Sequence, residues 1–526
     1  MENKHKIIAS PALLIMFLTF IGYVIGFAFQ MIIAYHFGAN RELDAFYIAS
    51  IIPNFVYDLF YGIFVTVFII VFSDFLDKEK DQNMNAVFSS YLSLVIVLLL
   101  LIILPLFIFS RYFASLVGPG FNEETIIFAA NILKILLLST FFLGVTTFTS
   151  GILYVKKNFL APSLVRISIG ICIIISLLIA GDLLGVYVLA IGTVVGSFLI
   201  MIIHLYAVKK EGISLALSFN WNNEYVKKVL TLSLPLIIYT AFFYLNRSLN
   251  SILASYLPMG SVASLNYGFV IISSPIILFS GSIGLVLFPL LREKIVLNKI
   301  DEFKKLLKYS LSVIIYILTP ISIFFILFAE EIIHVFFERG EFSSGLTSSV
   351  GEVLLFYSIG IIALGVHTII LKTLYSLKKI KTQVLLMAIL FCINITLSLL
   401  FMGNMGISGL ALAFSLAHWI IICMGLFLIR ENLGKPEIGM IAEAFLKAML
   451  GSVIAGSLSL MVYYVMIMAG NLFLESRIAI SVSFFLVSFV YVGVYIIVSK
   501  LLKNNELYVI MTNLKKITHD KMKIQL

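Results

Sequence analysis

Apolar residues fill nearly every window of about twenty positions along this chain, and only short polar connections interrupt them. A helix needs about 20 apolar residues to cross a bilayer core, and lipid offers no partner to open backbone groups. The pattern therefore predicts transmembrane helices and not the alternating ten-residue strands of a membrane β-barrel. About fourteen spans are expected, at 9–36, 43–75, 84–109, 125–153, 160–181, 184–208, 229–257, 264–291, 306–329, 350–376, 383–402, 406–429, 443–469 and 477–502.

The second half of the chain repeats the first at an offset of about 221 residues. Leu-Gly-Val, a Thr, Leu-Tyr and a Lys recur in the segments that begin at Leu143 and Leu364, and Tyr35 falls on Tyr256. Each repeat holds an even number of spans, so both copies enter the membrane from the same side as a parallel repeat. We expect an N-lobe at 1–209 (six spans), a cytoplasmic linker or short amphipathic helix at 210–228, a C-lobe at 229–430 (six spans), and two extra helices with a basic tail at 431–526.

Prolines occupy corresponding places in the two copies, because Pro53 in the second span comes within a residue of Pro275 in the eighth. Proline removes a backbone donor and kinks a helix. These two positions are the expected hinges of the lobes.

Charge placement sets the expected orientation. The chain carries a net charge of +9, with a hydrophobic fraction of 61% and a charged fraction of 12%. Lysines and arginines gather in alternate connections, so the positive-inside rule puts both termini in the cytoplasm of a multi-pass inner-membrane protein. Membrane headgroups explain the basic loops without nucleic acid as a partner. The basic stretches lie at 78–80, 156–157, 209–228, 292–308, 378–381, 430–435 and 500–523.

Sequence motifs for cofactors and metals are not found. Cys172, Cys392 and Cys423 lie inside spans without zinc or disulfide spacing, and no nucleotide-binding P-loop is present. His367 and His418 are single span histidines, for which packing or a hydrogen bond is expected. We expect no cofactor and no bound metal, so a gradient or the membrane potential must drive any transport.

Arg247 is the strongest candidate for a site residue. It lies in the middle of the seventh span, with Asn246 before it and Asn250 about one helical turn after it. An arginine at mid-depth costs at least about 2.5–3.5 kcal/mol, so it should bind a headgroup phosphate, form a structural ion pair or snorkel to an interface. Asp58 in the second span is its expected partner across a cavity, although a local partner for each is an equal alternative.

Further charges lie closer to the span ends. Lys134 in the fourth span is expected to reach the cavity from the outer half, whereas Arg166, near the cytoplasmic start of the fifth span, is expected to snorkel.

Several segments resemble the MurJ (MviN) family of lipid II flippases in the MOP exporter superfamily. Their order and spacing over about twelve spans carry the resemblance, more than any single motif. The segments are AYHFGANRELDAFYIASIIPN at 34–54, GSVASLNYGFVIISSPIILFSGSIGLVLFPLLRE at 260–293, FFERGEF, FYSIGI and TLYSLKKIKT within 335–382, and GISGLALAFSLA at 406–417.

The resemblance implies two lobes around a cavity that opens alternately to either side, with the last two helices forming a groove for a lipid tail. It also implies an undecaprenyl-pyrophosphate-linked saccharide as substrate, and it aligns Asp44 with a family aspartate. Family arginines are replaced here by Phe29, by Tyr57-Asp58 and by Tyr267-Gly268-Phe269. These replacements remove the expected pyrophosphate ligands.

Some relatives bind sodium between their seventh and eleventh spans, which makes Asn250, Asn394 and Ser398 a candidate cation site. No carboxylate is among the three, and hard cations favour anionic oxygen. Hydrogen bonding between helices is the alternative role of these residues.

The sequence thus predicts an all-α integral membrane protein of about 14 helices that flips lipid II or a similar peptidoglycan precursor as a monomer. Alternatives are a related exporter of another lipid-linked polysaccharide or of a cationic amphiphile, a membrane-embedded transferase, and a scaffold that transports nothing. The transferase lacks clustered acids or histidines at an interface, so no catalytic residues are expected.

Overall fold

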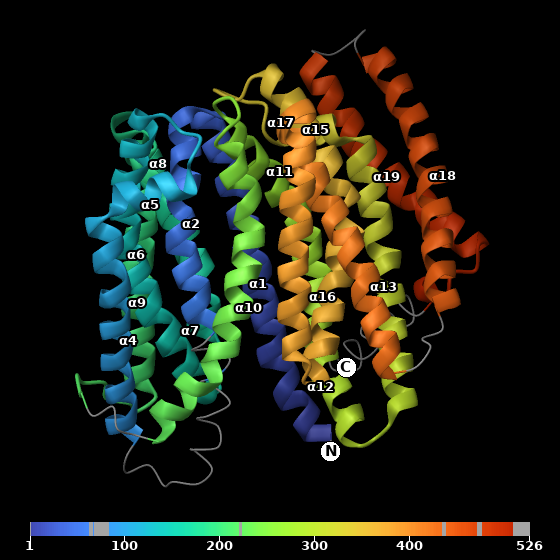
Figure 1. The fold of residues 1–526 in the computed structure, drawn as a ribbon. Coiled ribbons are helices and arrows are strands. Elements are labelled where there is room, and N and C mark those ends of the chain that lie inside the picture. Colours follow the sequence, from blue (N-terminus) through green and yellow to red (C-terminus); the bar gives the residue numbers. More distant parts are fainter. Residues whose placement is uncertain are drawn as a thin grey trace, which may run out of the picture. The chain divides into compact units, whose positions relative to one another are not determined.

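The computed structural model describes residues 2–62, 67, 84–219, 224–433, 438–470 and 476–508. Every regular element within these ranges is a helix, so the expected all-α class is confirmed (Figure 1). By backbone contacts the chain forms two compact units, one made of residues 1–266 and 339–342 and the other of 267–338 and 343–526.

Eleven helices in the described ranges are long and apolar enough to cross a membrane, and the bent pair formed by α15 (Ser344–Ile359) and α16 (Ile361–Ser376) adds a twelfth span. One of the eleven, Ile380–Arg430, contains a break at Gly406 (φ 54°, ψ −131°), where the sequence separates its eleventh and twelfth spans. The seventh expected span corresponds to a further helix, α10. The observed helices are therefore consistent with fourteen spans.

The first unit contains most of the helices of the first repeat together with α10. The helices α2, α6 and α9 pack in sequence through its interior, while α4 packs on α6 and α8 on α9 (Figure 1). The helices are α1 (Glu2–Phe37), α2 (Arg41–Tyr61), α4 (Met84–Ile108), α5 (Ser110–Val117), α6 (Glu123–Val155), α7 (Leu160–Ser163), α8 (Val165–Leu184), α9 (Tyr187–Lys210) and α10 (Glu224–Ala254).

The second unit holds the remaining helices, and α11 begins six residues before its boundary. Here α13 packs against α15, α16 and α18, and α18 packs on α19. The helices are α11 (Ser261–Pro275), the π-helical turn η2 (Ile276–Gly281), α12 (Ser282–Val296), α13 (Ile300–Leu327), α14 (Ala329–Phe336), α15 (Ser344–Ile359), α16 (Ile361–Ser376), α17 (Ile380–Leu433), α18 (Ile438–Gly470) and α19 (Ser476–Leu501).

The repeat is visible in the order of elements. A long helix, an eight-residue helix and another long helix follow one another as α4, α5 and α6, and again as α13, α14 and α15. The contact boundary at residue 266 nevertheless groups α10 with the first unit, whereas the repeat places the start of the second copy at residue 229. The grouping by contacts and the grouping by repeat therefore differ by one helix.

The two predicted hinge prolines lie in different local structures. Helix α2 runs through Pro53 up to Tyr61, but α11 ends at Pro275 and continues as a π-helical turn. A π-turn widens the backbone and is frequent at functional sites. The asymmetry makes the Pro275 region the more irregular of the two expected hinges.

The tenth span is broken at Gly360, although the sequence predicts it as one continuous helix. Helices α15 and α16 meet there at an angle of 43°. A Cβ atom on Gly360 would lie 2.7 Å from the Ser415 hydroxyl oxygen, so the close packing of α17 requires glycine. Its counterpart in the first unit, α6, is an unbroken helix of 33 residues.

Side chains satisfy the carbonyls that this break removes from the helical ladder. The hydroxyl of Ser415 donates to the carbonyl of Phe356 (2.7 Å), that of Ser322 to Ser358 (2.7 Å), and the Trp419 indole to Ile359 (2.9 Å). Lipid offers no alternative donors, so these bonds allow a break within the membrane. The break is thus part of the fold of the second unit.

Within the expected linker, residues 213–219 contain no helix, whereas residue 210 ends α9 and residues 224–228 begin α10. Alternate amides of the segment 213–219 donate to side chains one helical turn apart on α4: Ser214 to Asn85 (3.1 Å), Ala216 to Ser89 (3.0 Å) and Ser218 to Ser93 (2.7 Å). Two residues of a strand span about 6.8 Å and four of a helix about 6 Å, so the two spacings match. Residues 220–223 lie outside the described residues.

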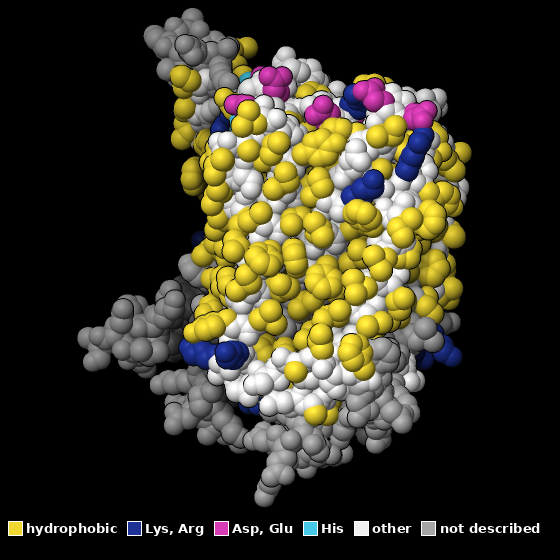
Figure 2. All heavy atoms as spheres, turned by 90° about the vertical axis from the view of Figure 1, so that its left-hand side faces the viewer, with side chains coloured by type: hydrophobic (Ala, Val, Ile, Leu, Met, Phe, Trp, Pro, Cys, Tyr) yellow, Lys and Arg dark blue, Asp and Glu magenta, His cyan; other side chains and the backbone are white. Residues whose placement is uncertain are grey.

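On the face shown in Figure 2, apolar side chains cover the middle band, acidic side chains and some lysines or arginines lie along the upper rim, and further lysines or arginines lie at the lower edge. An apolar band between charged rims is the surface expected of a protein that spans a bilayer.

Candidate functional site

Two arginines of the first unit lie within electrostatic reach of one aspartate. The charges of Arg247 on α10 and Arg166 on α8 both act on the Asp58 carboxylate of α2. Both arginine side chains are exposed and Asp58 is half-buried. The group therefore combines two cations with one anion, a net positive site of the kind that binds phosphate.

Arg166 is held in place by α1. Its guanidinium lies 4.4 Å above the ring of Tyr23, within the range of a cation–π interaction. Its side-chain stem passes close to Gly22, where a Cβ atom would lie 3.3 Å from the Arg166 Cδ atom. The sequence indicates only snorkelling for Arg166, because the distance along the chain to Asp58 gives no sign of their proximity.

The residues around Arg247 point in different directions. Asn246 and Asn250, four residues apart on one helical face, are buried at 5% and 3% exposure, whereas Arg247 on the adjacent face is exposed. The two asparagines therefore lie in the packing of the unit, and only Arg247 is accessible to a ligand.

Asp44 is a helix cap in this conformation. Its two carboxylate oxygens accept the backbone N–H groups of Gly260 (2.6 Å) and Ala263 (2.7 Å), at the start of α11. The side chain is 2% exposed. A carboxylate at a helix N-terminus is favoured by the unpaired amides and by the helix dipole. Asp44 thus joins α2 to α11 instead of facing an open space.

Lys134 on α6 lies beside α4, with its ammonium 5.9 Å from the centre of the Phe107 ring. This contact is compatible with a weak cation–π interaction. Lys134 thus lies against α4, whereas the two arginines that act on Asp58 lie on α8 and α10.

The candidate cation residues fall in different units. Asn394 and Ser398 on α17 are fully buried in the second unit, with the Ser398 hydroxyl 3.4 Å from the Asn394 side-chain oxygen, while Asn250 belongs to the first unit. The described residues contain no group of three or more His, Cys, Asp or Glu side chains able to hold a metal ion.

His367 and His418, which the sequence treats as separate, face each other in the second unit. Their ring centres are 5.6 Å apart in a T-shaped arrangement, and His418 Nδ1 lies 2.8 Å from the carbonyl of Phe414, one turn earlier. The two histidines are 51 residues apart along the chain, so the sequence gives no sign of this contact. Both rings are buried, as expected for packing histidines.

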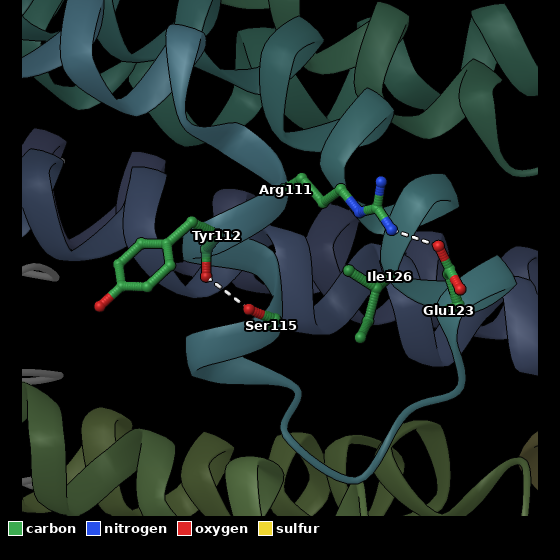
Figure 3. A pocket seen from close by; sticks show the side chains of 5 residues that line it. All are labelled: Arg111, Tyr112, Ser115, Glu123 and Ile126. Carbon is green, nitrogen blue, oxygen red and sulfur yellow. Dashed lines mark hydrogen bonds and ion pairs between the residues drawn. The ribbon is translucent and has the colours of Figure 1, made fainter.

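A pocket of about 490 Å³ lies between α5 and α6, lined by Arg111, Tyr112, Ser115, Glu123 and Ile126 (Figure 3). Arg111 points toward Glu123 and forms an ion pair with it, whereas the Tyr112 ring points away from both. The paired charges neutralise each other at this surface, so the pocket lacks the net positive charge of the Asp58 group.

The family model described as lipid II flippase MurJ matches residues 33–499, which is most of the chain. The chain belongs to the MurJ lipid II flippase family. A probable lipid II flippase MurJ of Borreliella burgdorferi is 26% identical over 451 residues, covering 85% of this chain and 88% of the relative. A probable lipid II flippase MurJ of Helicobacter pylori is 27% identical over 401 residues, covering 72% and 86%.

Solved structures support the same fold. A lipid II flippase MurJ in an inward closed conformation superimposes with a TM-score of 0.76 at 22% identity, covering 94% of this chain and all of that one. An inward-facing MATE multidrug transporter of the MOP superfamily gives 0.68 at 13% identity, covering 80% and 98%. The family model therefore confirms the expected assignment to the MurJ family, and both solved structures share the fold.

Where MurJ relatives are expected to carry an arginine in the eighth span, this chain packs aromatic rings. Tyr267 is buried against Phe337 (ring centres 5.4 Å apart), and Phe269 contacts Tyr357 at 6.0 Å. Aromatic contacts thus stand at the positions where this chain departs from the expected MurJ pattern.

Proposed function

We propose that this protein translocates an undecaprenyl-pyrophosphate-linked saccharide, lipid II or a similar peptidoglycan precursor, from the inner to the outer leaflet by alternating access. Membership of the MurJ family supports the class of substrate. The single observation that supports the headgroup site is the pair of exposed arginines, Arg166 and Arg247, whose charges both act on Asp58.

Two arginines can replace the ligands that the family pattern loses. Guanidiniums bind phosphate oxygens through paired, charge-assisted hydrogen bonds. Before substrate arrives, Asp58 compensates part of their charge, and a pyrophosphate would compete with Asp58 for them. The neighbouring Tyr57 and Tyr61, whose ring centres are 6.0 Å apart, offer apolar faces and hydroxyls suited to a sugar.

The membrane potential would assist this direction of transport. A negative charge that moves outward from a negative interior gains about 2.3 kcal/mol per 100 mV. We propose the potential as the driving force, with cytoplasmic termini and a monomeric carrier. A sodium site at Asn250, Asn394 and Ser398 is a secondary proposal, since it supplies no carboxylate.

A cationic amphiphile suits this site less well. Asp58 is the anion such a substrate would seek, but Arg166 and Arg247 both act on it. A cationic substrate would be repelled by the two arginines.

The test is complementation of MurJ-depleted cells, with exposure of lipid II at the outer face as the measurement. We expect Arg166→Gln and Arg247→Gln each to reduce flipping about tenfold or more, as loss of a charge-assisted hydrogen bond implies. Arg111→Gln, which removes a guanidinium that is paired with Glu123 between α5 and α6, is the matched control. Normal membrane insertion without rescue by the unaltered protein would contradict lipid II as substrate.

Coupling within the group needs a double-mutant cycle. If Asp58 restrains Arg247, the Asp58→Asn and Arg247→Gln double variant should lose less activity than the sum of the single losses. Strict additivity would contradict the coupling while leaving the phosphate role of Arg247 intact.

A further inference from the structure

Two turns in the first compact unit correspond through the repeat and share one backbone hydrogen bond. The offset of about 221 residues places Gly118 on Arg339 and Phe121 on Phe342. In each turn the phenylalanine N–H donates to the carbonyl three residues earlier at 3.1 Å, and each turn leads into a helix, α6 or α15. We call 118–121 the first loop and 339–342 the second loop.

Each loop docks on the end of a helix that belongs to the other copy of the repeat. In the first loop, the Gly120 N–H donates to the Ser255 hydroxyl at 3.0 Å, just after α10. In the second loop, the Glu341 N–H donates to the Tyr35 carbonyl at 2.9 Å, near the end of α1. Gly120 and Glu341 are equivalent positions. Tyr35 is equivalent to Tyr256, the neighbour of Ser255, so the two contacts are reciprocal to within one residue.

Glycine allows the close approach on both sides. A Cβ atom on Gly120 would collide with the backbone of Ser255 and Tyr256, and one on Gly340 would collide with the Tyr35 carbonyl. Gly340 also has φ +58°, which glycine adopts without strain. Both contacts therefore require a residue without a side chain.

A third close contact lies beside these two. A Cβ atom on Gly260 (φ +88°) would lie 2.5 Å from the Ala39 carbonyl, and Asp44 holds the same glycine through its N–H group. The connections that follow α1 and α10 are thus packed backbone to backbone at one end of the unit.

We propose that the two docked loops form a reciprocal clasp that seals the extracytoplasmic end of the transport path and that must release for the path to open outward. Each loop contributes one hydrogen bond and one close backbone contact, which gives a specific seal that can break within a transport cycle. The role of the clasp in moving lipid II rests on the proposed function, but the sealing itself can be measured without any substrate.

The first test measures access from outside. Ser264, which is 3% exposed and one turn into α11, is replaced by cysteine after Cys172, Cys392 and Cys423 are replaced by alanine, and a membrane-impermeant maleimide is applied. We expect Gly120→Ala and Gly340→Ala each to raise the labelling rate about fivefold to tenfold, the effect of losing about one net hydrogen bond. The double variant should label faster than either.

Two other glycines are the matched controls. Gly26 has no atom within 4 Å of its Cβ position, as a control for Gly120, and Gly212 combines open space with φ +79°, as a control for Gly340. Gly26→Ala and Gly212→Ala should leave labelling at the parent rate. Labelling that stays at the parent rate in both clasp variants as well would overturn the proposal.

The second test locks the clasp without crowding it. A backbone hydrogen bond of 2.9 Å joins Glu341 to Tyr35, and a disulfide needs two Cα atoms about 4.4–6.8 Å apart. In the cysteine-free background, Tyr35→Cys with Glu341→Cys should crosslink on mild oxidation and lose lipid II flipping, which a reductant restores. Crosslinked protein that flips lipid II as fast as protein treated with a reductant would contradict the gate. Protein that flips no lipid II even after treatment with a reductant would contradict the proposed substrate instead.

Discussion

The hydroxyl of Tyr495 on α19 donates a hydrogen bond of 2.9 Å to the carbonyl of Tyr316 on α13. That carbonyl has no helical donor, because the residue four positions later is Pro320. One turn earlier on α19, the Tyr491 hydroxyl donates to the Pro320 carbonyl at 2.9 Å. Two tyrosines of α19 therefore stabilise the proline site of α13, and the last two helices are bonded into the second unit.

Tyr495→Phe should destabilise the protein by about 1–2 kcal/mol, because it leaves the Tyr316 carbonyl unsatisfied in an apolar setting while keeping the ring. The measurement is the thermal unfolding midpoint in detergent. Tyr464→Phe, at an exposed tyrosine of α18, is the control and should leave the midpoint unchanged. Equal midpoints for both variants would show that another donor satisfies the carbonyl.

Windows of apolar residues predicted the helices well. A span needs enough apolar side chains to cross the bilayer and must satisfy its own backbone hydrogen bonds, and both requirements depend on the sequence of that span alone. The windows missed the break at Gly360, since a glycine inside an apolar window looks like any other small residue. The donors that make the break tolerable, Ser322, Ser415 and Trp419, come from other helices. Tertiary packing decides such a break, and a single window does not contain it.

Site residues were predictable only in part for the same reason. Asp58 and Arg247 could be identified from the sequence because a charge in the middle of a span is costly, whichever residue is its partner. Joining Arg166 to them requires the packing of α8 against α1, which brings its guanidinium over Tyr23. Asp44 was marked by family resemblance, but its role as a cap of α11 depends on amides more than 200 residues away.

Ser415→Ala should loosen the broken tenth span. It removes the donor to Phe356 and the packing partner of Gly360, so we expect a stability loss of about 1 kcal/mol. With Trp221 replaced by phenylalanine, Trp419 is the sole tryptophan, and its emission should shift as its bond to Ile359 weakens.

The control for this variant is Ser457→Ala, since Ser457 is exposed and bonds only to its own helix at Val453. It should change neither the unfolding midpoint nor the Trp419 emission. A Ser415→Ala variant that behaves like this control would mean that the break does not depend on the α17 side chains.

Ser89→Ala combined with Ser93→Ala should release the segment 213–219 from α4, because the amides of Ala216 and Ser218 lose their acceptors. Limited digestion with chymotrypsin, which cleaves after the exposed Leu217 or Phe219, measures the release. We expect cleavage to accelerate about tenfold, since local opening costs less by about one hydrogen bond per site. Ser115→Ala, at an exposed serine of α5, should cleave at the parent rate, and an unchanged rate in the double variant would contradict the docking.

Glu331 on α14, outside the membrane spans, should make stability depend on pH. Burial raises the pKa of this carboxyl above its ordinary value of 4.5, and the hydrogen bond to Tyr463 only partly opposes the shift. The folded protein thus binds the proton more tightly than the unfolded chain does, so its stabilising effect is present at low pH and is lost as pH rises through the folded pKa.

Glu331→Gln should therefore raise the unfolding midpoint at about pH 7 and flatten its change between about pH 4.5 and 7, because the amide carries no charge to desolvate. Glu341→Gln, at an exposed side chain whose backbone N–H is retained, is the control and should keep the pH profile of the parent. The prediction fails if the unfolding midpoint of Glu331→Gln changes with pH as steeply as that of the parent, since the buried carboxyl would then not be the group that titrates.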